Sequence, residues 1–146
     1  MCIRDRVFGR VTYEGMASFW PTPEAMAADP VIAPKMNNLK KIVVSRTLQL
    51  AEWNNTRLIK GNLVEEFTAL KKQPGKELII LGSSALTVSL MELGLVDEFR
   101  IMVTPVVLGG GTPLFKGLKG KFPLRLVKTE THQSGNVIHY YEPVKS

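Results

Sequence analysis

Three short segments of the chain combine small residues with hydroxyl or cationic side chains, a mixture suited to binding phosphate groups. The first is Gly9-Arg10-Val11-Thr12, at the predicted start of a helix. Free backbone N–H groups and the positive end of a helix dipole favour an anion there, while Gly9 permits close approach and Arg10 adds positive charge. A capped helix with an exposed arginine explains the same residues equally well.

The other two segments follow predicted strands. Ser45-Arg46-Thr47 comes directly after a β-branched run. Because ligands of open α/β sheets lie at the carboxyl ends of strands, an arginine beside hydroxyls suits a phosphomonoester such as the 2′-phosphate of NADPH, with a plain polar turn as the alternative. The third segment, Gly82, Ser83, Ser84 and Ala85, also follows a predicted strand and opens a helix. Such small residues let the backbone approach a pyrophosphate, although the full Gly-x-Gly-x-x-Gly spacing is absent. Together the three turns predict a dinucleotide site.

Other chemistry finds less support in the sequence. Gly109, Gly110 and Gly111 form either a substrate-facing loop or a flexible turn. His132 and His139 lack a third metal ligand, so we interpret them as structural or exposed and predict no metal site. The single cysteine, Cys2, has no orienting partner, so a nucleophilic hydrolase is not predicted.

Composition and charge narrow the class of protein. The 146 residues are 45% hydrophobic and 22% charged, which is typical of one globular domain. A lone cysteine and short apolar runs predict a cytoplasmic protein without a signal peptide or membrane span. The net charge of +6 suits an anionic partner. Its cations are scattered without interleaved aromatic residues, so nucleic acid is not the predicted partner.

Hydrophobic periodicity predicts alternating helices and strands followed by a β-rich end. This order favours an α/β fold with a mixed sheet. The predicted helices cover residues 11–19 and 31–37, a segment after Asn62, and a segment through Leu86 and Leu90 that ends at Gly94. The predicted strands cover residues 41–45, 56–60, 77–81 and 97–104, and a hairpin of residues 124–131 and 137–142.

From Val7 to the C-terminus the chain resembles the dihydrofolate reductase-like superfamily, and within it the branch containing the reductase domain of bacterial riboflavin biosynthesis. Four groups of residues carry the resemblance: Phe8-Gly9-Arg10-Val11-Thr12-Tyr13-Glu14; Val43-Val44-Ser45-Arg46; Ile79-Ile80-Leu81-Gly82-Ser83-Ser84; and Gly94-Leu95-Val96-Asp97-Glu98 followed by Pro105-Val106-Val107-Leu108-Gly109-Gly110-Gly111-Thr112-Pro113-Leu114-Phe115. The resemblance implies a three-layer α/β fold with a mixed, mainly parallel central sheet and a C-terminal antiparallel hairpin.

The resemblance also implies roles for the candidate residues. Gly9, Arg10 and Thr12 would meet the cofactor phosphates, and Ser45 with Arg46 would contact the 2′-phosphate, which favours NADPH over NADH. The turn formed by Gly82, Ser83, Ser84 and Ala85 would lie beneath the pyrophosphate, where the family more often has glycines. The function implied is an NADPH-dependent reductase that transfers hydride to a small heterocycle, similar to 5-amino-6-(5-phosphoribosylamino)uracil or to a pterin. No catalytic residue is assigned.

The start of the chain departs from the family pattern. Family members begin with an apolar strand, a Ser-x-Asp-Gly-like turn and a helix, which residues 1–6 do not resemble. We therefore expect residues 1–6 to be a non-native leader and residues 7–146 to be a single domain that lacks its first strand and helix, with an unpaired sheet edge. A homodimer through the hairpin and the 105–115 loop is a further expectation. A nucleotide-binding module without turnover and a basic nucleic-acid-binding domain are the alternative functions.

Overall fold

The computed structural model describes residues 3–145 of the chain. The chain packs as two compact units, with the boundary after Thr87, inside helix α5. The first unit holds β1 (Ile3–Gly9), α1 (Arg10–Phe19), α2 (Pro23–Ala28), α3 (Ile32–Asn38), β2 (Lys40–Val44), β3 (Thr56–Ile59), α4 (Leu63–Lys72) and β4 (Glu77–Ile80), and α5 (Ser84–Glu92) leads into the second. The second unit holds β5 (Phe99–Val103), β6 (Leu124–Thr131) and β7 (Val137–Pro143).

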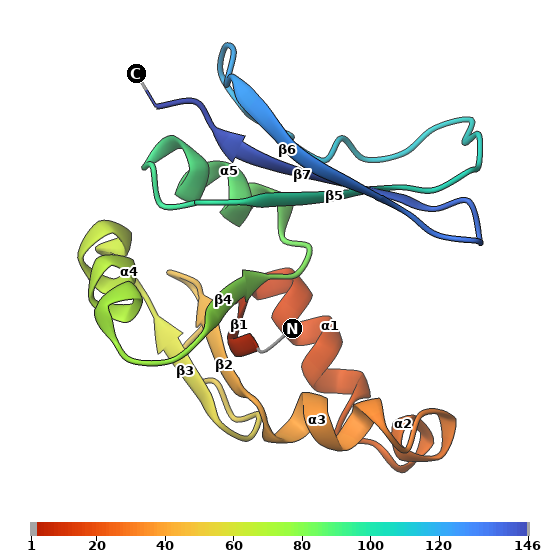
Figure 1. Cartoon of the computed structure of the whole chain (residues 1–146). Coiled ribbons are helices and arrows are strands. Elements are labelled where there is room, and N and C mark those ends of the chain that lie inside the picture. The colour runs from red at the N-terminus through yellow and green to blue at the C-terminus, as the bar shows by residue number, and fades with distance from the viewer. Residues whose placement is uncertain (1–2, 146) are drawn as a thin grey trace. The chain divides into compact units, whose positions relative to one another are not determined.

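The first unit is built on a four-stranded parallel sheet of order β3-β2-β1-β4 (Figure 1). Strand β1 is central: Val7 is in register with Ile42 of β2 on one side and with Ile80 of β4 on the other. A strand with sheet on both edges is buried on both sides, and Val7 and Phe8 are fully buried. The remaining edge of β4 pairs with no strand among the described residues.

An aromatic cluster packs α1 and α3 against this sheet. Its buried members are Phe8, Tyr13, Met36, Val43 and Trp53. The ring of Trp53 lies 6.4 Å from that of Phe8 and 6.1 Å from that of Tyr13, within the range of favourable aromatic pairs. Burial of each large apolar side chain contributes roughly 1.5–3 kcal/mol, so this cluster anchors the start of α1 to the sheet.

The second unit contains a three-stranded antiparallel sheet of order β5-β7-β6. Strands β6 and β7 form the hairpin, whose turn contains Gly135 at φ +87°. A Cβ atom at this position would lie 2.9 Å from Cγ of Pro105, so both the backbone conformation and the space require glycine. The ring of Phe99 in β5 packs edge-on against those of Phe115 and Phe122.

The structure confirms the α/β class and the mixed, mainly parallel strand arrangement, and it distributes the strands over two sheets. Two elements were not predicted. Helix α2 begins at a proline after the capping residue Thr22, within a stretch predicted to be largely irregular. Strand β1 was missed because its charged residues Arg4, Asp5 and Arg6 interrupt any apolar period.

Residues 3–6, assigned on sequence to a leader, thus form part of β1, whereas Met1 and Cys2 lie outside the described residues. Whether the six residues are native to the domain, and whether a further strand and helix belong to it, stay predictions. Within the described part of the chain no helix is long and apolar enough to cross a membrane.

Candidate functional site

The carboxyl ends of β1, β2 and β4 bring the three predicted phosphate-binding segments of the first unit to one edge of the sheet. The strand order β3-β2-β1-β4 places the segment after β1 between the other two. The chain runs from β1 to β2 and β3 on one side and then crosses to β4 on the other side. The strand order therefore reverses between β1 and β4, which is the kind of switch point where open α/β sheets bind ligands.

A direct hydrogen bond joins the two segments that flank this switch point. The backbone N–H of Gly9 donates to Oγ of Ser83 at 2.8 Å. Gly9 is the N-cap of α1, and a Cβ atom there would lie 3.3 Å from the same oxygen, so glycine makes the close approach possible. Gly82 lies beside Thr12, because a Cβ atom on Gly82 would lie 3.8 Å from Oγ1 of Thr12.

The turn after β4 has a left-handed backbone at two successive residues, with φ of +66° at Gly82 and +56° at Ser83. Glycine adopts this conformation freely, whereas serine does so at a cost of about 1–2 kcal/mol. The carbonyl of Ser83 accepts the N–H of Thr87 and so begins the helical bonding of α5. Ser84 and Ala85 form the first residues of that helix, Ser84 half-buried and Ala85 exposed.

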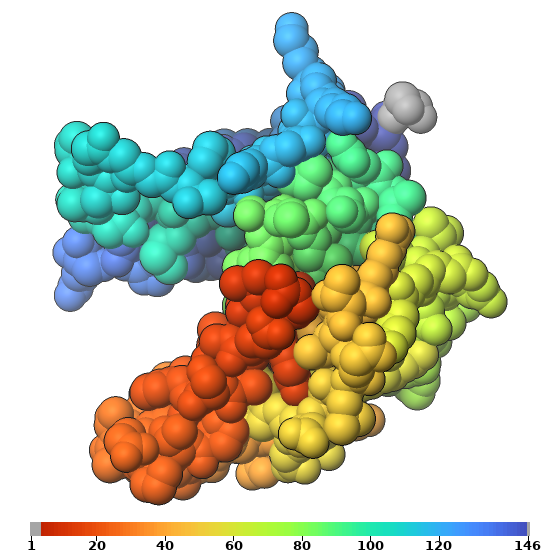
Figure 2. All heavy atoms as spheres, turned by 180° about the vertical axis from the view of Figure 1, so that it is seen from behind, coloured from red at the N-terminus to blue at the C-terminus, as the bar shows by residue number. Residues whose placement is uncertain are grey.

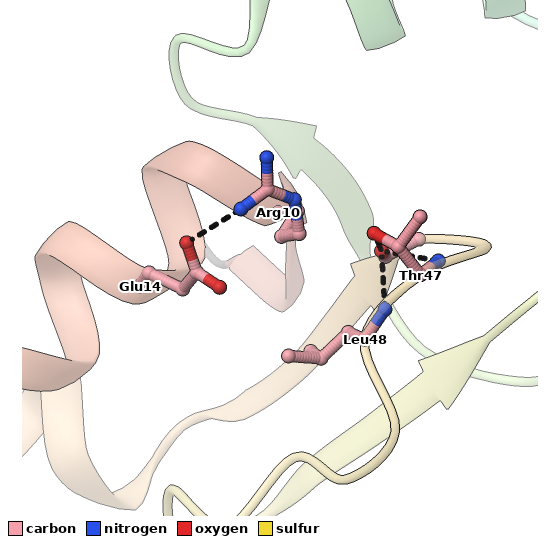
Figure 3. A network of polar contacts seen from close by, with 5 residues as sticks. Arg10, Glu14, Thr47 and Leu48 are labelled. Carbon is pink, nitrogen blue, oxygen red and sulfur yellow. Dashed lines mark hydrogen bonds and ion pairs between the residues drawn. The ribbon is translucent and has the colours of Figure 1, made fainter.

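Arg10 is held loosely at the start of α1. Its Nη1 lies 2.9 Å from Oε2 of Glu14, one helical turn further on (Figure 3). Both side chains are about half exposed, at 45% and 48%, and a solvated pair of this kind contributes little free energy. The guanidinium of Arg10 can therefore exchange Glu14 for a more strongly charged anion at small cost.

Ser45 organises the loop that follows β2. Its buried Oγ accepts hydrogen bonds from the backbone N–H groups of Thr47 at 3.2 Å and Leu48 at 3.0 Å (Figure 3). Arg46 is exposed and makes no ion pair or hydrogen bond with any residue between 3 and 145. Ser45 thus shapes the turn, and Arg46 is the cation that the turn presents.

The start of α1 and the loop after β2 lie side by side in both close and distant views (Figures 2 and 3). The segment coloured red, which includes the beginning of α1, borders the amber segment that follows β2 in the space-filling view (Figure 2). Arg10 and Thr47 are labelled next to each other in the close view (Figure 3). Both arginines therefore come from neighbouring segments at one edge of the sheet.

The structure brings only part of the predicted set together. Gly109, Gly110 and Gly111 belong to the second unit, in the exposed segment between β5 and β6. None of the three has a left-handed φ, and a Cβ atom on any of them would meet nothing within 4 Å. Neither the backbone conformation nor the surrounding space requires glycine at these three positions, and their role in substrate binding stays a prediction.

Sequence reasoning also missed a cavity of about 670 Å³ in the first unit, between α1 and the segment before β3. Its lining includes Tyr13, Glu14, Glu52 and Trp53 and contains no lysine, arginine or histidine. Glu14 is paired with Arg10, but the cavity lining itself supplies two carboxylates and no cation, so the edge of the sheet that presents Arg46 is the better place for an anionic ligand. Among the described residues, no cluster of acidic, histidine or cysteine side chains could hold a metal ion.

The family assignment follows from a match over almost the whole described chain. The model of the RibD C-terminal domain matches residues 7–140, which include all three segments of the site and most of the hairpin. This chain belongs to the RibD C-terminal domain family. The RibD C-terminal domain described here is also similar to two Bacillus subtilis (strain 168) proteins named as uncharacterized, YyaP and YwjB. It is 37% identical to YyaP over 131 residues, or 90% of this chain and 69% of YyaP, and 41% identical to YwjB over 75 residues, or 51% of this chain and 43% of YwjB.

Solved structures support the same fold. A putative riboflavin biosynthesis protein from Shewanella sp. PV-4 matches with a TM-score of 0.74 and 25% identity, over 98% of this chain and 75% of that chain. Dihydrofolate reductase from Enterococcus faecalis, solved with NADP(H), matches with a TM-score of 0.62 and 20% identity, over 99% of this chain and 77% of that chain. The RibD C-terminal domain therefore has a dihydrofolate reductase-like fold and belongs to a reductase-like family.

Proposed function

We propose that this RibD C-terminal domain is an NADPH-dependent reductase of a small heterocyclic substrate. The proposal rests mainly on one observation. At the switch point of the parallel sheet, the Gly9–Ser83 hydrogen bond joins the start of α1 to the turn after β4, and Arg10 and Arg46 lie in the neighbouring segments. The family membership supports a reductase, and a fold-level relative was solved with NADP(H).

The residues present fit a phosphate-rich cofactor. The start of α1 offers backbone N–H groups, Arg10 and Arg46 offer full positive charges, and Gly82 offers an exposed backbone in the left-handed conformation. The carboxylate of Glu14, one helical turn after Arg10, is paired with that arginine. We assign the pyrophosphate to the turn of Gly82 and Ser83 and the 2′-phosphate to Arg46.

NADPH, when bound, supplies a hydride to an electrophilic carbon of the substrate. The protein contributes binding, orientation and electrostatics to such a transfer, so a conspicuous catalytic cluster is not needed. A C=N or C=O carbon in a pterin-like or phosphoribosylaminopyrimidine-like compound is the substrate class we propose. The lone cysteine fits a reducing compartment, and we place the activity in the cytoplasm.

Thermal melts with and without nucleotide test this proposal. A ligand that binds only the folded state raises the melting temperature, so saturating NADPH is expected to raise it by several degrees and NADH by much less. Arg46→Ala is expected to abolish most of the difference between the two nucleotides, because it removes the cation assigned to the 2′-phosphate. Lys76→Ala, which changes an exposed cation before the amino end of β4 and so at the opposite edge of the sheet, is the matched control.

A cooperative melt that neither nucleotide shifts would reject the reductase. Binding of NADPH without turnover of any heterocyclic substrate would favour a nucleotide-binding module. Affinity for duplex DNA with a steep salt dependence would favour a nucleic-acid-binding domain instead.

A further inference from the structure

We propose that the cavity between α1 and the segment before β3 is a second ligand site, which takes a small organic cation: a protonated amine on a flat apolar body. The cavity lies wholly in the first unit, and its lining contains none of the residues assigned to NADPH. Its volume of about 670 Å³ lies within the range of small-molecule sites in proteins. The inference therefore goes beyond the proposed function and does not depend on it.

Apolar and aromatic side chains form one part of the wall. Ala17 belongs to α1, Pro21 follows that helix, and Leu50 and Trp53 come from the segment before β3. Tyr13 and Trp53 are buried, whereas Leu50 is 66% exposed beside the cavity. A flat apolar ligand would remove part of this surface from water, which favours binding.

Hydrogen bonds within the first unit hold this wall in place. Nε1 of Trp53 donates to Oδ1 of Asn37 at 2.8 Å, and Nδ2 of Asn37 donates to the carbonyl oxygen of Trp20 at 2.9 Å. The backbone N–H of Trp53 donates to the Tyr13 hydroxyl at 3.1 Å, and Nδ2 of Asn54 donates to the carbonyl oxygen of Asn37 at 3.3 Å. The cavity is therefore preformed, so binding does not have to order its wall.

The free polar groups of the wall are acceptors. The side-chain N–H groups of the lining already donate to the acceptors just named. The carboxylate of Glu52 makes no hydrogen bond or ion pair with any residue between 3 and 145, and Glu14 uses only its Oε2, on Arg10. Free acceptors with negative charge suit a ligand that brings N–H donors and a positive charge.

The negative charge of this wall is unusual in a chain whose net charge is +6, because the lining contains no lysine, arginine or histidine. Lys41 lies 4.4 Å from the ring centroid of Trp53, but it is 1% exposed and donates to three backbone carbonyl oxygens, which offset its charge. No group of three acidic, histidine or cysteine side chains occurs between residues 3 and 145 in a metal-binding arrangement. An organic cation therefore fits the wall better than a metal ion.

Three indole compounds of similar shape and different charge test the proposal. At neutral pH tryptamine is a cation, tryptophol is neutral and indole-3-acetate is an anion. Tryptamine is expected to bind the full chain with a Kd of about 1 mM, given the affinity usual per ligand atom, and tryptophol about tenfold more weakly. Indole-3-acetate is expected not to bind. NMR titrations of the ¹⁵N-labelled chain at one low ionic strength give the three constants.

The same spectra locate the ligand, because the chain has two tryptophans. The indole N–H signal of Trp53, in the lining, is expected to shift with tryptamine, and that of Trp20, outside the lining, to shift much less. Glu52→Gln keeps the shape of the wall and removes one charge, so the Kd of tryptamine is expected to rise about threefold and that of tryptophol to stay unchanged. Glu24→Gln, at an exposed carboxylate of α2 outside the lining, is the matched control and is expected to change neither constant.

Thermal melts of both variants are expected to match that of the wild-type chain, since both substitutions are at exposed positions. Equal constants for tryptamine and tryptophol would show that the wall does not recognise charge, and the amine site would be wrong. A Trp53 signal that none of the three compounds shifts would show that the cavity does not bind this class of ligand. If Glu24→Gln weakens tryptamine as much as Glu52→Gln does, the amine responds to the net charge of the chain, and the assignment to this cavity is rejected.

Discussion

Lys41 is a cation whose whole side chain is buried in the first unit. It is 1% exposed, and its Nζ donates to the carbonyl oxygens of Met36 at 3.0 Å, Asn37 at 2.9 Å and Leu39 at 2.7 Å. The same ammonium lies 4.4 Å from the ring centroid of Trp53. Lys41 therefore satisfies the carbonyl groups at the end of α3 and adds a favourable cation–π contact.

Burial, and secondarily the charge of Arg6, lowers the pKa of Lys41 from 10.5 to about 8. The folded chain then releases this proton before the unfolded chain does, so the free energy of unfolding is expected to rise between about pH 8 and pH 10.5, by at most about 3 kcal/mol. Urea unfolding across this range measures the rise. Lys41→Met is expected to remove it and Lys40→Met, at the exposed neighbour, to retain it. Equal pH profiles in all three chains would contradict the assignment.

At the scale of elements, one hydroxyl ties α1 to the segment before β3. The backbone N–H of Trp53 donates to the hydroxyl oxygen of Tyr13 at 3.1 Å, and both residues are buried. This hydrogen bond and the aromatic cluster hold the helix whose first turn carries Arg10. The position of the site therefore depends on a contact 40 residues apart in the sequence.

Tyr13→Phe keeps the ring and removes the hydroxyl, so the amide of Trp53 is left buried without its partner. We expect the free energy of unfolding to fall by about 1–3 kcal/mol, measured by urea unfolding at neutral pH. Tyr141→Phe is a matched control, because the Tyr141 hydroxyl makes no hydrogen bond with any residue that the structure describes. A loss of the same size in the control would show that the change reports the ring environment and not this hydrogen bond.

At the scale of the whole molecule, exposed apolar side chains are numerous in the second unit. Val107 is 97% exposed, and its neighbours Val106 and Leu108 are also exposed, in the segment that the sequence predicts to mediate a homodimer. Exposed apolar side chains that cluster on a surface are typical of interaction sites. Size-exclusion chromatography with light scattering is expected to give about 32 kDa, twice the chain mass of 16.2 kDa.

Val107→Asp is expected to return the molecule to the mass of one chain, because a buried unpaired carboxylate opposes association. Val64→Asp, at an exposed position of α4, changes charge equally and is expected to leave the dimer intact. A wild-type chain that stays at 16.2 kDa at concentrations of tens of micromolar would reject the homodimer.

The sequence by itself determined those features of the protein that depend on residues close together in the chain. Periodicity and turn residues predicted the α/β class, β2, β4, α1 and the hairpin, since each depends on residues that are close in sequence. The same local patterns, with the family motifs, picked out Gly9, Arg10, Arg46 and Gly82. Strand β1 was not predicted, because Arg4, Asp5 and Arg6 are charged and form a strand by pairing with β2 and β4.

Only the tertiary structure decided how these residues meet. The strand order β3-β2-β1-β4 places the segment after β1 between the other two, because strand pairing joins residues far apart in the chain. It also decided that Ser45 turns inward to its own loop and that the Ser83 hydroxyl accepts the amide of Gly9, 74 residues away. A side chain's partner depends on packing between distant segments, and a linear motif carries no information about that packing.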